Sequence, residues 1–256
     1  MKINQVFETL KSAGGIRAAQ IITENTEKIS KLKLWYICHK LRQGVPVAKI
    51  IHQKWFYGLK FYTNKYTLDP RPDTETLVAT VISDCSENKN YTILDLGTGT
   101  GCIISSLIKN IPNARGIGTD KSWPAIMVAR KNVKHLNLTD KIKIIKDDFY
   151  KSKKINETFD IIVSNPPYIS KEDTRINDAA LHDPKTALFA KDNGLAAYKA
   201  IAKNAKKWLK PTGQIYLEIG SGQSQKVKNI FEKENWTFIR IEKDLSGIKR
   251  VLVFKK

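Results

Sequence analysis

From residue 72 onward, short apolar segments alternate with helical stretches, and this alternation limits the chain to few folds. Strands separated by helices predict a mainly parallel sheet that helices cover on both faces. The loop around Ser246 and Gly247 is too short for a crossover helix, so the last strand is expected to be antiparallel. The sequence therefore predicts an α/β fold with a seven-stranded, mainly parallel sheet. The predicted strands are 92–96, 115–119, 142–146, 159–164, 214–219, 237–241 and 250–254.

Residues 1–66 have a different pattern. Apolar residues recur at three- and four-residue spacings over 3–10, 16–29 and 32–41, which predicts three short helices. An aromatic, alternating stretch follows over 55–66, and it predicts a β-hairpin with Gly58 near its turn. The expected division is a small helical domain with a linking hairpin over 1–66 and a larger domain over 67–256. In the larger domain, Pro72 is suited to start the first helix.

The segment 95–101, Asp-Leu-Gly-Thr-Gly-Thr-Gly, closes the first strand of the larger domain and precedes a helix. Glycines at alternate positions let the backbone approach a ligand closely at a helix N-terminus. A dinucleotide-binding turn would place its last glycine where this chain has Cys102. An acid before the first glycine instead suits the ammonium group of S-adenosylmethionine. The expected cofactor contacts here are Asp95, Gly97, Thr98, Gly99, Thr100 and Gly101.

Acidic residues also follow the next two predicted strands. Asp120 is suited to accept hydrogen bonds from a ribose diol. Asp148 could accept from an adenine amino group, and Phe149 could cover the ring. The carboxyl ends of parallel strands form the edge at which open α/β sheets bind ligands. Together these acids predict a site for a nucleoside cofactor.

Residues 165–168, Asn-Pro-Pro-Tyr, follow the fourth predicted strand and carry the expected catalytic chemistry. A planar NH₂ group is a poor nucleophile because its lone pair is delocalised. The Asn165 side-chain oxygen and the Pro166 carbonyl could accept its two hydrogens, since the prolines hold the turn rigid. Tyr168 could stack on the planar group. Asn165, Pro166 and Tyr168 are therefore the expected catalytic residues, with Asn165 also at the cofactor, and no general base is required.

The chain carries a formal net charge of +19, with 44 Lys and Arg residues, of which eight are Arg. This charge indicates either an acidic partner or a lysine-rich composition, because nucleic-acid readers more often concentrate Arg. No apolar run approaches the roughly 18 residues that span a bilayer. Three cysteines without metal-ligand spacing and no apolar leader predict a cytoplasmic protein without a metal site.

With these motifs in order, the sequence resembles class I S-adenosylmethionine-dependent methyltransferases, and among them the HemK/PrmC family of protein-(glutamine-N5) methyltransferases. The resemblance covers roughly residues 40 to 256 and departs from the family at Trp55 and Asp69, where an acid and an aliphatic residue are usual. The helical region before Arg42 is also shorter than usual. The resemblance rests on 42–46, the aromatic hairpin, 69–75, 95–101, Asp120, 165–168, 182–188 and 192–195.

The resemblance implies a Rossmann-like fold, S-adenosylmethionine as cofactor and S-adenosylhomocysteine as product. It implies methylation of the glutamine in the Gly-Gly-Gln loop of class I peptide chain release factors, which modulates translation termination. The N-terminal helical domain would help to hold the release factor. Matching positions make Arg71, Pro72 and 165–168, including Pro167, the expected substrate contacts.

Three alternatives remain open at this point. A glutamine methyltransferase of a ribosomal protein would have the same fold and motif. An adenine amino-methyltransferase of DNA or RNA would suit the charge, but only about 25 residues separate Tyr168 from Gly194, too few for a target-recognition domain. A non-catalytic RNA-binding protein would be expected to lose Asn165 or the glycines. Nucleic acid is thus not expected to be required for catalysis, although the basic surface leaves a weak association with RNA or the ribosome open.

Overall fold

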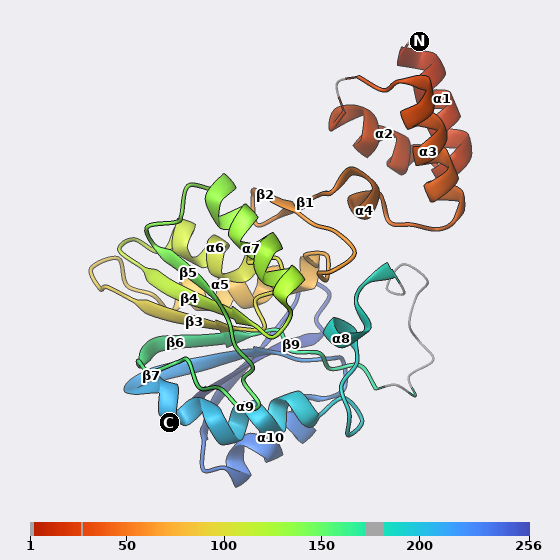
Figure 1. Cartoon of the computed structure of the whole chain (residues 1–256). Helices are drawn as coiled ribbons and strands as arrows, with labels where there is room; N and C mark the ends of the chain where they lie inside the picture. The colour runs from red at the N-terminus through yellow and green to blue at the C-terminus, as the bar shows by residue number, and fades with distance from the viewer. Residues whose placement is uncertain (1–2, 27, 171, 173–181) are drawn as a thin grey trace.

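The computed structural model describes residues 3–26, 28–170, 172 and 182–256, and Figure 1 shows their arrangement. A seven-stranded sheet forms the centre of the larger domain, in the order β5-β4-β3-β6-β7-β9-β8. β9 is antiparallel to both neighbours, and the pairs among β3 to β7 are parallel, so the predicted fold class is confirmed. The strands are β3 (Thr92–Leu96), β4 (Arg115–Asp120), β5 (Ile142–Lys146), β6 (Phe159–Ser164), β7 (Leu209–Glu218), β8 (Thr237–Lys243) and β9 (Lys249–Lys255).

Helices cover both faces of this sheet because successive strand residues point to opposite sides. In β3, for example, Ile93 packs into the core under α5, α6 and α7, whereas Leu94 packs into the core against α9 and α10. Figure 1 shows these two helical layers above and below the strands. The helices are α5 (Glu75–Ser83), α6 (Cys102–Asn110), α7 (Trp123–His135), α8 (Lys185–Leu188), α9 (Ala196–Asn204) and α10 (Ser224–Lys233), with 3₁₀ turns η1 (Pro72–Thr74) and η3 (Ala205–Trp208).

The N-terminal helices α1 (Ile3–Gly14), α2 (Ile16–Glu24) and α3 (Lys31–Arg42) enclose a separate apolar core. They lie apart from the sheet, and α4 (Val47–Ile51) leads from them to the hairpin (Figure 1). The hairpin consists of β1 (Gln53–Phe56) and β2 (Leu59–Tyr62), and it packs on α7. The division into domains at residue 66 stays a prediction.

Several elements differ from the sequence-based expectation. The hairpin spans residues 53–62 and not 55–66, and Pro72 starts the 3₁₀ turn η1, so that α5 begins only at Glu75. α2 ends at Glu24 because Asn25 caps it, its side-chain and backbone N–H groups both bonding the Ile21 carbonyl. α4 was not predicted, since five residues are too few for a helical period to be recognised. β7 begins at Leu209, five residues earlier than predicted, because the stretch around Pro211 has the composition of a turn. No helix of the described part of the chain is long and apolar enough to cross a membrane.

Candidate active site

The carboxyl end of β3 continues into a glycine-rich turn that folds over the end of β4. The N–H groups of Gly97 and Thr98 both donate to the Thr119 carbonyl, at 2.9 and 2.8 Å. Gly97 and Gly101 have φ values of +77°, a conformation that glycine adopts without strain. Because α6 begins at Cys102, the turn joins the sheet edge to a helix N-terminus, an arrangement that favours polar or anionic ligand groups.

Asp95 lies beneath this turn. Its fully buried carboxylate accepts a hydrogen bond of 2.6 Å from the Thr98 hydroxyl. Burial raises the pKa of Asp95 to about 7, although the Thr98 hydrogen bond opposes this rise. The other carboxylate oxygen has no partner within the described structure. Asp95 therefore holds the turn in place, and its direct contact with a cofactor ammonium stays a prediction.

A cavity with about 750 Å³ of empty space, partly open to solvent, lies beside the turn at the carboxyl edge of the sheet. Asp120, Asp148 and Phe149 all line it, so the residues predicted at successive strand ends are brought together. Asp120 accepts hydrogen bonds from the Gly99 and Ser122 N–H groups at 3.1 and 2.8 Å, and each oxygen keeps a lone pair for a diol. Burial also raises the pKa of Asp120.

Three further segments of the chain line the rest of the cavity. Gly97 and Gly99 line the cavity from the turn, whereas Thr98, Thr100 and Gly101 do not. The segment 66–68, which follows the hairpin, forms a second wall. A third wall contains residues at the start of α8. The sequence did not predict a cofactor role for the last two segments. The α8 residues that line the cavity are Pro184, Thr186 and Ala187.

Asn165 lines the same cavity, and its side-chain nitrogen is held from behind. Its Nδ2 donates a hydrogen bond of 3.1 Å to the Thr74 hydroxyl. The Thr74 hydroxyl also lies beside the buried Glu218 carboxyl and lowers its pKa. Because an amide nitrogen can only donate, the Thr74 hydroxyl accepts from Asn165 and keeps its own hydrogen for another acceptor. Asn165 Oδ1 receives no hydrogen bond from the described residues, and it is therefore available to a ligand.

Tyr168 belongs to the same group of contacts. Its hydroxyl donates to Glu218 at 3.4 Å, and its carbonyl accepts from the Gln223 side chain at 2.9 Å. Burial raises the pKa of Tyr168, so the hydroxyl stays protonated. Pro167 lines the cavity, whereas Pro166 and Tyr168 do not. The stacking of Tyr168 on a planar substrate group stays a prediction.

Arg71 and Pro72, which were predicted to contact the substrate, line a separate groove. This groove lies between α2, α4 and β1 on one side and the segment before η1 on the other. Trp55, with 58% of its surface exposed, also lines it. Arg71 donates to the buried Asp183 carboxylate at 2.5 Å. The predicted substrate residues therefore lie at two places, the cavity and this neighbouring groove.

Four residues that shape the site had no predicted role: Lys49, Thr74, Asp183 and Glu218. Two of them, Lys49 and Glu218, stand out in the sequence as charged residues within apolar segments. Lys49 is the one charge within the apolar segment 47–51, and Glu218 interrupts the apolar segment 215–219. A charged residue in a buried element needs an ionic or hydrogen-bonding partner, so the pattern at both positions predicts a buried polar contact.

The comparisons with known proteins agree with this geometry. The methyltransferase small domain family matches residues 71–237. A release factor glutamine methyltransferase from Caulobacter vibrioides is 35% identical over 95% of this chain and 86% of that protein. The chain belongs to the release factor glutamine methyltransferase family. S-adenosylmethionine is the methyl donor of these enzymes, and the cavity residues fit it. Asp120 can accept hydrogen bonds from the ribose diol, and Phe149 can cover the adenine ring.

Other relatives differ in length. A bifunctional methyltransferase from Rickettsia felis is 41% identical over 82% of this chain, but the match covers only 45% of that protein. This chain thus spans about half the length of such relatives. A methyltransferase from Pyrococcus furiosus superposes with a TM-score of 0.58 at 17% identity, covering 88% of this chain and 97% of that chain. That likeness concerns the fold alone.

Proposed function

We propose that this protein methylates the side-chain amide nitrogen (N5) of the glutamine in the Gly-Gly-Gln motif of class I peptide chain release factors, in the cytoplasm, and so modulates translation termination. One observation carries the proposal. Asn165 lines the cofactor cavity with its nitrogen bound to Thr74, which leaves an amide oxygen for a planar NH₂ group. The release factor glutamine methyltransferase from Caulobacter vibrioides supports glutamine as the target.

S-adenosylmethionine supplies a methyl group activated by its sulfonium sulfur. Gly97, Gly99, Asp120 and Phe149 would hold it in the cavity. The Asn165 oxygen and the neighbouring Pro166 carbonyl would accept the two hydrogens of the glutamine amide, which orients the nitrogen and stabilises positive charge on it. These residues contribute placement and exclusion of water, worth on the order of several kcal/mol. The proton released from nitrogen passes to solvent.

The decisive test supplies radiolabelled S-adenosylmethionine with one acceptor at a time. We expect label in a class I release factor and none in its Gln-to-Ala variant at the Gly-Gly-Gln motif. Ribosomal proteins and DNA or RNA are the competing acceptors. Label in nucleic acid or in a ribosomal protein alone, or undiminished label in the Gln-to-Ala factor, would contradict the proposal.

Asn165→Ala tests the residue on which the chemistry depends. We expect kcat to fall at least a hundredfold, because a lost hydrogen bond to developing charge has effects of this size. The Kd of S-adenosylmethionine should change less than about threefold, as measured by calorimetry. Asn229→Ala is the matched control, since Asn229 lies exposed on α10 and bonds only Gln225 among the described residues. Unchanged turnover of Asn165→Ala would remove this residue from its role.

A further inference from the structure

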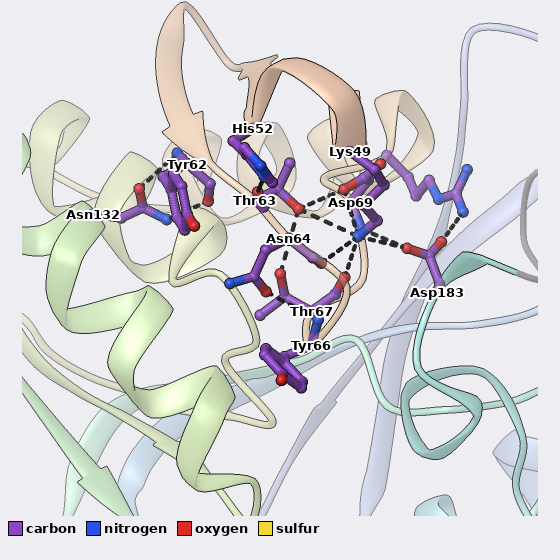
Figure 2. Close-up of polar contacts among 11 residues, drawn as sticks. Lys49, His52, Tyr62, Thr63, Asn64, Tyr66, Thr67, Asp69, Asn132 and Asp183 are labelled. Atoms are coloured by element: carbon purple, nitrogen blue, oxygen red, sulfur yellow. Dashed lines mark hydrogen bonds and ion pairs between the residues drawn. The ribbon is translucent and has the colours of Figure 1, made fainter. Parts of the chain in front are cut away.

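A buried ionic network connects the N-terminal region to the cofactor cavity, and Figure 2 shows its members. The Lys49 side chain on α4 is 6% exposed, and its ammonium nitrogen lies 2.8 Å from Asp69 Oδ1 and 2.9 Å from Asp183 Oδ1. Arg71 pairs with the second oxygen of Asp183. Two cations therefore balance two carboxylates, both of which are buried. Asp69, the unusual acid before Pro70, is explained by its pairing with Lys49.

The Lys49 ammonium also holds the backbone of the segment that follows the hairpin. It donates to the Asn64 carbonyl at 2.7 Å and to the Thr67 carbonyl at 2.5 Å. The Thr63 hydroxyl lies 3.4 Å from the same nitrogen and donates to Asp69 at 2.5 Å. One nitrogen atom thus fixes several points of segment 63–69. This segment contains residues 66–68, which form one wall of the cofactor cavity.

The cavity wall at the start of α8 is held by the same Lys49 nitrogen. Asp183 directly precedes Pro184, and Pro184 and the start of α8 line the cavity. The Asp183 side chain is 2% exposed, and its Oδ1 also accepts the Asp69 N–H at 3.3 Å. Lys49 is therefore the common attachment of two cavity walls that are more than a hundred residues apart in sequence, although Lys49 itself does not line the cavity.

We propose that Lys49 is a positioning residue that fixes the spacing between segment 66–68 and the start of α8, and thereby sets cofactor affinity. The inference deepens the proposed function, because it rests on S-adenosylmethionine binding in this cavity. Without the ammonium, segment 63–69 keeps only the hydrogen bond of 3.3 Å from the Asp69 N–H to Asp183. Two carboxylates would also remain buried beside a single cation, which is unfavourable.

Two variants separate positioning from simple stabilisation. Lys49→Met removes the ammonium and leaves an unbranched side chain that is one atom shorter. Lys49→Met with Asp69→Leu removes one charge of each sign, so the pair of Arg71 and Asp183 stays balanced. We expect the single variant to bind S-adenosylhomocysteine at least tenfold more weakly by calorimetry and to unfold at a lower temperature. The double variant should regain most of its Tm and still bind at least fivefold more weakly than the unaltered protein.

Lys210→Met is the matched control. Lys210 also pairs with a buried carboxylate, that of Asp160 at 2.8 Å, but it lies at the opposite edge of the sheet from the cavity. Its cofactor Kd should be unchanged. Unaltered affinity in the double variant, or recovery of affinity together with Tm, would overturn the positioning role. If the single variant fails to fold, the double variant decides. Cofactor binding without methylation of a release factor would contradict only the proposed substrate.

Discussion

At the scale of single residues, the proposed chemistry depends on which atom of the Asn165 amide would face the substrate. Thr74 decides this, since its hydroxyl accepts a hydrogen bond from the amide nitrogen and leaves the amide oxygen toward the cavity. If the Asn165 amide were rotated by 180°, its N–H groups would face the N–H groups of the substrate. They could not accept hydrogen bonds from them. Under the proposed function, Thr74 would therefore control the chemistry through Asn165 without touching the substrate itself.

Thr74→Val tests this arrangement, because valine keeps the shape and removes the hydroxyl. We expect kcat on the release factor to fall tenfold to a hundredfold, with the Kd of S-adenosylmethionine nearly constant. Thr74→Ser, which keeps the hydroxyl, should stay within about threefold of the unaltered protein. Equal losses in both variants would mean that packing at this buried position, and not the hydroxyl, determines the rate.

Glu218 gives a prediction on stability and pH. Burial, opposed by the Thr74 hydrogen bond, raises its pKa from an ordinary value of 4.5 to about 7. The folded state therefore binds the proton more tightly, so the free energy of unfolding should fall as pH rises from about 4.5 to about 7. Glu218→Gln should lack this contribution, which is on the order of 3 kcal/mol.

Urea unfolding of both proteins at pH 5 and pH 8 measures the difference. Asp95, whose pKa burial also raises to about 7, gives the same pH dependence in both proteins and cancels. Parallel loss of stability in the two proteins would show that Glu218 does not titrate in this range.

At the scale of elements, a single side chain on α7 joins the hairpin to the glycine-rich turn. The fully buried Asn132 accepts the Tyr62 N–H at 2.7 Å and donates to the Tyr62 carbonyl at 2.9 Å (Figure 2). It also donates to the Thr100 carbonyl at 2.8 Å. The Asn132 side chain thus bonds both Tyr62 in β2 and Thr100 in the glycine-rich turn. The position of the hairpin, and of the cavity wall that follows it, depends on this contact.

Asn132→Ala should lower the free energy of unfolding by about 2–4 kcal/mol, because three hydrogen bonds are lost and buried backbone groups stay unpaired. Urea denaturation measures the loss, and faster hydrogen exchange at the Tyr62 amide would locate it. The exposed Asn229→Ala variant should change stability by less than about 0.5 kcal/mol. If Asn132→Ala lowered the free energy of unfolding by no more than Asn229→Ala does, packing alone would hold the hairpin in place.

At the scale of the whole molecule, the positive charge is unevenly distributed. Residues 1–66 contain twelve Lys and Arg against three Asp and Glu, and they account for nearly half of the net charge of +19 in a quarter of the chain. The groove with Trp55 and Arg71 lies where this region meets the larger domain. We therefore expect the protein substrate to dock here, separately from the cofactor, with an acidic surface toward the helices.

Trp55→Ala should raise the KM for the release factor at least tenfold, since an exposed Trp in a groove is a typical anchor. The values of kcat and of the cofactor Kd should stay within about twofold. Trp35→Ala is the comparison, because Trp35 is also exposed in the N-terminal region but does not line the groove. An equal rise in KM for both variants, measured by initial rates, would place docking elsewhere.

Much of the cavity was predictable from sequence. The glycine-rich turn, Asp120, Phe149 and Asn165 each follow a predicted strand, and the carboxyl ends of parallel strands meet at one edge whatever their order. The antiparallel last strand followed from a loop too short for a helix. Periodicity and loop length are local properties, and for that reason the sequence by itself determined the fold class and predicted several residues that line one cavity at the edge of the sheet.

Only the tertiary structure decided which residues hold that site. Glu218 meets Tyr168 because β6 and β7 pair in the register that aligns Ser164 with Leu217, and this register depends on burial of both strand faces. Lys49 meets Asp183 across 134 positions, a contact that no local pattern specifies. Long-range register and the docking of α4 against the segments at 63–69 and 183 arise from packing, so the residues that orient the chemistry became visible only in the folded chain.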